Sequence, residues 1–180
     1  NHFANAGAHE SNAHAIEPMR TDDEDSPIFV GTYADAGGEG VYPLHRSGSS
    51  WSLGEPYRGA ANASYGAYSP RHGIHFLVDE RGHGTVGAYR RERAGWRPLS
   101  RVPSGGREPC YAALDPAEDW LAVANYGSGS LSLFRLDPAT GLMGDPADRR
   151  QNAGHGPVPD RQEGPHAHCA VFSNDSRWLY

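Results

Sequence analysis

Apolar and polar residues alternate over short stretches along most of this chain, and helical periodicity is nearly absent. The 23 Gly and 14 Pro among the 180 residues suit many tight turns between short strands. This pattern predicts an all-β fold, followed by a long Gly-, Pro- and charge-rich connection from Asp137 to Pro165. The strands are expected at 28–33, 41–44, 51–57, 65–69, 75–79, 85–89, 96–102, 111–114, 121–125 and 130–136.

The strand pattern contains a phrase that recurs three times. Its copies are Ser64–Pro70, Cys110–Pro116 and His168–Asn174, and an apolar run follows each one. The first two copies lie 46 residues apart (116 − 70) and the next two 58 (174 − 116). A period of roughly 40–50 residues built from short strands is the signature of a β-propeller blade. We therefore predict a β-propeller of four-stranded antiparallel blades, with only about the first three blades present in an incomplete ring.

The first blade differs from the later ones. Ile28–Tyr33 aligns with Leu121–Tyr126, which is the second strand of a repeat and not the first. The innermost strand of the first blade is thus missing, and in a closed ring it would come from the C-terminus. Residues 27–180 are interpreted as the N-terminal part of a larger propeller domain, truncated at its C-terminus.

The first 26 residues are polar and rich in Ala, Asn and His, and they end in the acidic run Thr21–Asp25. Such a segment cannot bury enough apolar surface to order itself, so we expect a disordered N-terminal tail. Met19 is interpreted as a natural start, with the preceding residues lying outside the folded gene product.

Charge and hydropathy exclude two classes of partner. The formal charge of −6 and the pI near 5.9 argue against nucleic acid, which needs a basic face. No stretch approaches the ~20 apolar residues of a membrane span, and no apolar segment with preceding basic residues predicts a signal peptide. Cys110 and Cys169 begin equivalent strands and are expected to be free thiols. These features predict a cytoplasmic protein.

Candidate chemistry gathers where the inner strands begin. Because the first strand of each repeat lies nearest the propeller axis, Ser64, Cys110 and His168 should converge at one mouth of the central channel. The long connection feeds the same mouth, and its segment 158–168 holds Arg, Gln, Glu and two His. Loops that carry several ionisable residues on a rigid scaffold are the usual place for a site.

At this point the sequence resembles the seven-bladed β-propeller lactonases, best known for 6-phosphogluconolactonase members. The resemblance spans about residues 28–180, and its most specific motif is Arg161–His168, with the sequence RQEGPHAH. Supporting phrases in the same order are Phe29–Tyr33, Pro103–Gly106, Pro109–Cys110 and Val123–Ser130.

The resemblance implies hydrolysis of a sugar lactone, above all 6-phosphogluconolactone to 6-phosphogluconate, in carbohydrate metabolism. It implies no metal or cofactor, a small-molecule substrate, a monomeric full-length protein, and further Arg and Glu site residues beyond Tyr180. His168 suits the general base, because imidazole titrates near neutrality, and His166 is the second catalytic candidate. Arg161 is the candidate for anion binding because its planar fork holds two oxygens. The remaining substrate-binding candidates are Gln162, Glu163 and Cys110.

Other interpretations of the same residues stay open. His166 and His168 at i and i+2 point to one face of a strand, as a metal pair would, but no third ligand at suitable spacing accompanies them. Either histidine could be a structural hydrogen-bonding residue, and Arg161 could pair with Glu163 or Asp160 to fix the loop. A muconate-cyclase-like enzyme and a non-enzymatic propeller of the YVTN-repeat kind are the alternative functions. A calcium-dependent gluconolactonase would need a carboxylate and Asn ligand set that is not assembled here.

Overall fold

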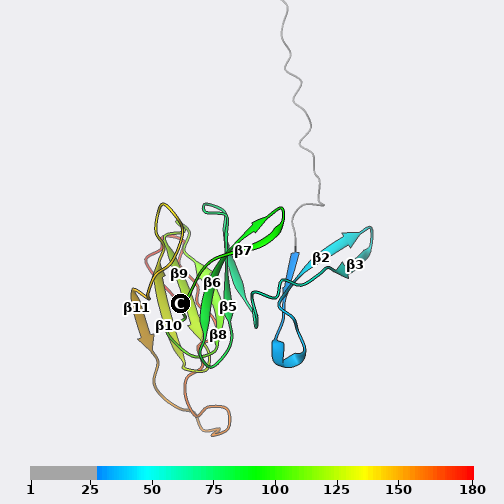
Figure 1. Cartoon of the computed structure of the whole chain (residues 1–180). Helices are drawn as coiled ribbons and strands as arrows, with labels where there is room; N and C mark the ends of the chain where they lie inside the picture. The colour runs from blue at the N-terminus through cyan, green and yellow to red at the C-terminus, as the bar shows by residue number, and fades with distance from the viewer. Residues whose placement is uncertain (1–27) are drawn as a thin grey trace, which may run out of the picture.

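The chain folds into three antiparallel sheets in a computed structural model that describes residues 28–180 (Figure 1). The predictions for the tail 1–26 and for Met19 lie outside the described residues. Within each sheet, strands that are consecutive in the chain are also neighbours in space. The only helical element among the described residues is a short 3-10 turn, η1 (Ala34–Ala36). The predicted all-β architecture is confirmed.

The first sheet has three strands and the other two have four each. The first sheet consists of β1 (Ile28–Gly31), β2 (Val41–Ser47) and β3 (Ser50–Leu53). The second consists of β4 (Gly66–Ser69), β5 (Ile74–Asp79), β6 (Thr85–Glu92) and β7 (Gly95–Pro103). The third consists of β8 (Pro109–Leu114), β9 (Trp120–Asn125), β10 (Ser130–Arg135) and β11 (Asp148–Gln151).

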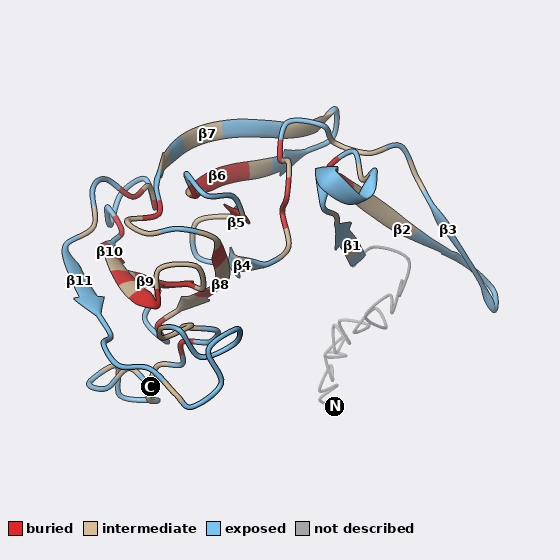
Figure 2. Cartoon of the chain, turned by 90° about the horizontal axis from the view of Figure 1, so that it is seen from below, coloured by how far each residue is buried: buried red, intermediate tan, exposed pale blue. Residues whose placement is uncertain are grey.

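The sheets are arranged as blades of a partial propeller. Strands β4 and β8 lie side by side toward the middle, while β3, β7 and β11 form the outer edges (Figure 2). The first sheet begins with β1, which aligns with the second strands of the other blades, and it accordingly has one strand fewer. The three blades do not close a ring.

Alternating apolar side chains form the core between the second and third blades. In β5, Ile74, Phe76 and Val78 are buried, and the intervening His75 and Leu77 are partly exposed. Burying one such large apolar side chain stabilises the fold by about 1.5–3 kcal/mol. The other buried members of this cluster are Val86, Ala88, Ala112, Leu121, Val123, Phe134, Leu136 and Met143. A smaller cluster between the first and second blades contains Val41, Ala60, Ala63 and Tyr89.

Three expectations need correction. Strand β11 lies inside the segment 137–165 that was expected to be an irregular connection, and it pairs with β10 at Leu131↔Arg150. Strand β3 ends at Leu53, whereas a strand to residue 57 was expected, and Tyr57 forms only an isolated bridge with Val41. The third repeat forms no extended strand but a short pairing, in which Val171 and Tyr180 exchange backbone hydrogen bonds of 2.8 Å each.

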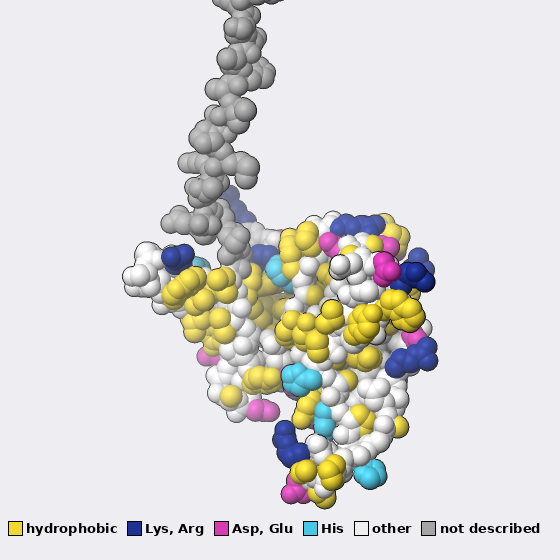
Figure 3. Space-filling model, turned by 180° about the vertical axis from the view of Figure 1, so that it is seen from behind, with side chains coloured by type: hydrophobic (Ala, Val, Ile, Leu, Met, Phe, Trp, Pro, Cys, Tyr) yellow, Lys and Arg dark blue, Asp and Glu magenta, His cyan; other side chains and the backbone are white. Residues whose placement is uncertain are grey.

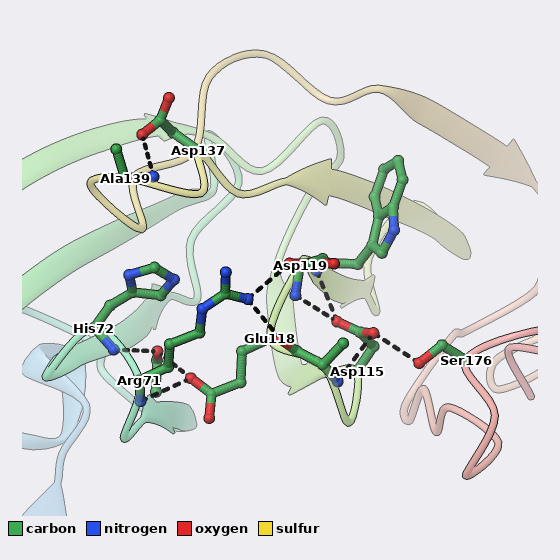
Figure 4. A network of polar contacts seen from close by, with 11 residues as sticks. Arg71, His72, Asp115, Glu118, Asp119, Asp137, Ala139 and Ser176 are labelled. Atoms are coloured by element: carbon green, nitrogen blue, oxygen red, sulfur yellow. Dashed lines mark hydrogen bonds and ion pairs between the residues drawn. The ribbon is translucent and has the colours of Figure 1, made fainter.

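Polar contacts join neighbouring blades where the inner strands end (Figure 4). Ser69, the last residue of β4, donates its hydroxyl proton to the Glu118 carboxylate of the third blade. Asp115, directly after β8, accepts a hydrogen bond of 2.7 Å from the Ser176 hydroxyl of the third repeat. The first bond joins residues 49 positions apart in the chain and the second joins residues 61 positions apart, so each bond holds one blade against the next.

Candidate active site at the mouth of the channel

The loops that lead into β4 and β8 are built in the same way. Asn62 and Glu108 have left-handed backbones, with φ of 47° and 52°. The Asn62 carbonyl accepts the Glu80 N–H at 3.1 Å, and the Glu108 carbonyl accepts the Tyr126 N–H at 2.8 Å. Glu80 follows β5 and Tyr126 follows β9, so this repeated contact holds both residues at the same end of the inner strands.

Glu80 is the acceptor at the centre of a small cluster on the second blade. Its carboxylate accepts the Tyr33 hydroxyl at 2.8 Å and the Ser64 hydroxyl. Burial and then the Glu80 carboxylate raise the pKa of Tyr33, so this phenol stays protonated as a donor. Ser64 thus lies at the mouth as expected, although its hydroxyl is occupied by Glu80.

Cys110 lies against the third repeat. Its sulfur is 3.6 Å from the Ala167 carbonyl oxygen and 3.8 Å from that of His168. Burial and then the Glu80 charge raise the pKa of the Cys110 thiol, which disfavours the nucleophilic thiolate. Since Glu80 also binds Ser64, the three positions expected to converge do gather at one mouth.

The residues that directly follow Ser64 and Cys110 also contact each other across the two blades. The Tyr65 and Tyr111 rings stack with centroids 4.2 Å apart. Hydrogen bonding with Tyr65 and then with Cys169 raises the pKa of Tyr111. Residues one position further along each inner strand are therefore also in contact around the axis.

His166 is held at both ring nitrogens. Its Nδ1 lies 3.2 Å from the Tyr126 carbonyl oxygen, and because a carbonyl can only accept, Nδ1 donates. Its Nε2 lies 3.2 Å from the Glu163 carboxylate, and the imidazole stacks on the Tyr126 ring with centroids 4.4 Å apart. Both neighbours are hydrogen-bond acceptors, so the two contacts fix the orientation of the ring.

His168 has a different environment. It is exposed and meets the Tyr126 ring edge-on, with centroids 5.7 Å apart. Among the described residues, neither of its ring nitrogens has a hydrogen-bond partner. The two histidines thus flank one tyrosine, with the His166 ring held by hydrogen bonds and the His168 ring exposed.

A cavity of about 300 Å³ opens beside His166. Its lining is mostly charged and consists of Arg107, Glu108, Tyr126, Gly127, Asp160, Arg161, Glu163 and His166. Histidine and basic side chains lie close together on the lower part of the face seen in Figure 3. The structure thus brings Arg161, Glu163 and His166 to one cavity, while His168 and Cys110 lie outside its lining.

Gln162 takes part in loop structure. Its side-chain oxygen accepts the Val158 N–H at 3.2 Å, and its backbone carbonyl accepts the Gly156 N–H at 2.8 Å. The residue therefore stabilises the turn before His166 and does not line the cavity. Its expected role in substrate binding has no contact in this structure to support it.

Tyr126, Arg107 and Glu108 were not among the predicted site residues. The Tyr126 ring touches both histidines, and its carbonyl binds one of them. One feature of the sequence could have identified Tyr126: it aligns with Glu80, because each residue comes directly after the second strand of its blade. Across residues 28–180, no three His, Cys, Asp or Glu side chains are grouped so that they could hold a metal ion. The same part of the chain contains no helix with the length and apolarity of a membrane span.

Comparisons with known proteins place this geometry in a family. Residues 27–180 match the family model described as "Lactonase, 7-bladed beta-propeller". A 6-phosphogluconolactonase of Bacillus subtilis is 29% identical over 156 residues, which cover 84% of this chain and 44% of that protein. A 6-phosphogluconolactonase of Formosa agariphila is 30% identical over 162 residues, covering 85% and 45%.

A solved structure supports the same family assignment. The periplasmic gluconolactonase of Pseudomonas aeruginosa superposes with a TM-score of 0.73 at 27% identity, covering 85% of this chain and 46% of that one. The chain therefore spans less than half the length of the relatives that it matches. The repeat, the blades and the family match lead to one conclusion: this chain belongs to the seven-bladed β-propeller lactonase family.

Proposed function

We propose that the protein hydrolyses a sugar lactone, with 6-phosphogluconolactone as the leading substrate and 6-phosphogluconate as its product. The observation that carries the proposal is the pair of histidines around Tyr126, one of them in the wall of a cavity that also holds Arg161. The two curated relatives are named for this activity. The cytoplasmic location, the place in glucose metabolism and the monomeric state stay predictions.

His168 acts as the general base in this proposal. Its free ring nitrogen takes a proton from water while the water oxygen forms a bond to the lactone carbonyl carbon. The bond from that carbon to the ring oxygen then breaks, and the ring oxygen receives the proton back from His168 and leaves as a hydroxyl. The product is the open-chain acid, and no oxidant or reductant is consumed.

His166 has a positioning role. Its contacts to the Tyr126 carbonyl and to Glu163 fix the wall of the cavity and the edge of the ring that His168 meets. Arg161 lines the same cavity and supplies positive charge for the phosphate of the substrate. The substrate would thus lie across Tyr126, with its phosphate in the cavity and its lactone carbonyl toward His168.

The test replaces His168 with Ala in the full-length protein, and the exposed His45 of β2 provides the matched control. Lactone turnover is followed as acid release, after subtraction of spontaneous hydrolysis. Loss of a general base should lower kcat by about 10²–10⁴-fold. His45→Ala should leave kcat unchanged. Full turnover by His168→Ala would remove His168 from the mechanism, and absence of turnover by the wild-type protein would overturn the lactonase proposal and favour a binding scaffold.

A further inference from the structure

Arg107 lines the same cavity as Arg161 and comes from a different element. It lies in the loop before β8, where its N–H donates to the Ser128 hydroxyl at 3.1 Å and its carbonyl accepts the Gly127 N–H at 3.1 Å. Its guanidinium donates to the Gly127 carbonyl at 2.6 Å. This anchor uses one of about five guanidinium N–H groups, so the others remain available to a ligand.

Neither cavity arginine forms an ion pair with a carboxylate of residues 28–180. In the described part of the chain, Arg58, Arg71 and Arg97 each form an ion pair with an acidic side chain, whereas Arg107 and Arg161 form none. The acidic residue Glu163 in the cavity wall contacts His166 instead. Two guanidinium groups without a carboxylate partner therefore share one small cavity.

The lining as a whole carries no excess of positive charge. Its two arginines are outnumbered by the three carboxylates of Glu108, Asp160 and Glu163. Long-range attraction of an anion is therefore weak, and recognition must come from direct contact. An arginine fork forms such contacts because two parallel N–H donors match two oxygens of a phosphate.

We propose that Arg107 and Arg161 together bind the phosphate of a phosphorylated sugar lactone, and that Arg107 is thereby a specificity-determining residue. The inference rests on the proposed lactonase function and adds the residue that separates phosphorylated from neutral substrates. The cavity volume of about 300 Å³ is at the small end of ligand sites, which suits the phosphate end of one sugar.

The test is Arg107→Gln in the full-length protein. Glutamine removes the charge but keeps a polar N–H donor, and the backbone bonds of residue 107 to Ser128 and Gly127 still anchor the loop. KM is expected to rise about tenfold or more for 6-phosphogluconolactone, because charge-assisted hydrogen bonds are lost, and to change less than about twofold for glucono-δ-lactone. Arg161→Gln should show the same selectivity, and Arg107→Lys should lie between Gln and wild type.

Arg93, exposed in the turn between β6 and β7, provides the matched control as Arg93→Gln. Equal loss on both lactones, or no change on either, would overturn the role of Arg107. Calorimetric titration with inorganic phosphate separates this proposal from the proposed reaction. If the protein binds phosphate through Arg107 but does not turn over lactones, the anion site is supported and the proposed reaction is overturned. If the protein turns over lactones but Arg107→Gln leaves phosphate binding unchanged, the anion site is overturned and the proposed reaction stands.

Discussion

Replacing Asp115 tests how the blades are held together. The Asp115 side chain is 2% exposed and follows β8 directly. Its Oδ1 accepts the N–H groups of Asp119 and Trp120 at 2.8 Å each, while Oδ2 accepts the Ser176 hydroxyl at 2.7 Å and a longer bond from Ala117. The carboxylate therefore closes the turn between β8 and β9 and also binds the next repeat.

The expected cost follows from these contacts. Asp115→Ala loses three short hydrogen bonds at about 1 kcal/mol each, so the free energy of unfolding should fall by about 3 kcal/mol. Asp115→Asn keeps one oxygen for the two turn bonds and should lose about 1 kcal/mol. Ser176→Ala removes only the bond to the next repeat and should also cost about 1 kcal/mol.

Asp137 supplies the matched control because it forms the same kind of turn in full exposure. Its Oδ1 accepts the Ala139 N–H at 3.0 Å and the Thr140 N–H at 2.7 Å, as Figure 4 shows in part. Water can replace these exposed bonds, so Asp137→Ala should barely move the unfolding midpoint. The assay is equilibrium urea unfolding of the full-length protein. Equal losses for Asp115→Ala and Asp137→Ala would refute the reasoning, as would an Asn substitution at residue 115 as costly as Ala.

The same variants should leave the chemistry unaffected. Asp115 and Cys110 are five residues apart along β8, or about 17 Å at roughly 3.4 Å per residue. The inter-blade contact and the histidine pair therefore lie at opposite ends of the inner strands. Folded Asp115→Asn should keep kcat/KM within about twofold of wild type, although its free energy of unfolding is lower.

Two further predictions concern titratable groups. Burial, and to a smaller extent the Arg91 charge, lower the pKa of His75. The unfolded chain therefore binds more protons than the folded one as the pH falls below about 6.5, and the free energy of unfolding should decrease there. Urea midpoints at pH 7.5 and 5.5 should differ less in His75→Gln than in wild type, and an unchanged difference would contradict this. The raised pKa of Cys110 predicts that iodoacetamide at pH 7 alkylates the exposed Cys169 first, as mass spectrometry of the peptides can show. Faster alkylation of Cys110 would contradict the neutral thiol.

Strands were predictable wherever a side chain had to be buried. Apolar alternation in β5 and an uninterrupted apolar run in β9 mark the core directly, so the positions of both strands agree with the sequence to within one residue. Strand β11 has the sequence DRRQ and is exposed throughout, so no hydrophobic pattern announces it. Its pairing depends on the free edge of β10, which is a property of the neighbouring strand and not of its own residues.

The site was predictable only in part, for a related reason. The spacing of the repeat placed Cys110 and His168 at one mouth, because homologous positions in blades face the same axis. The stacking of Tyr126 on His166 joins residues 40 positions apart through a ring and a carbonyl, and no local pattern encodes that contact. Arg107 was missed because its significance lies in the cavity that it shares with a distant loop.

In each of the three repeats, the residue at one equivalent position contacts the preceding blade. This repeated contact explains how the site arises from the scaffold. Asn62, Glu108 and His166 are spaced by 46 and 58 residues, as the repeats are. The Asn62 side chain accepts the Ala34 N–H at 2.7 Å, and the Glu108 N–H donates to the Arg81 carbonyl at 2.9 Å. His166 contacts the preceding blade one position earlier, at the Tyr126 carbonyl, and does so through its imidazole. In the third repeat, therefore, an imidazole replaces a purely structural contact, and the longer connection before it brings Arg161 and Glu163 to the same cavity.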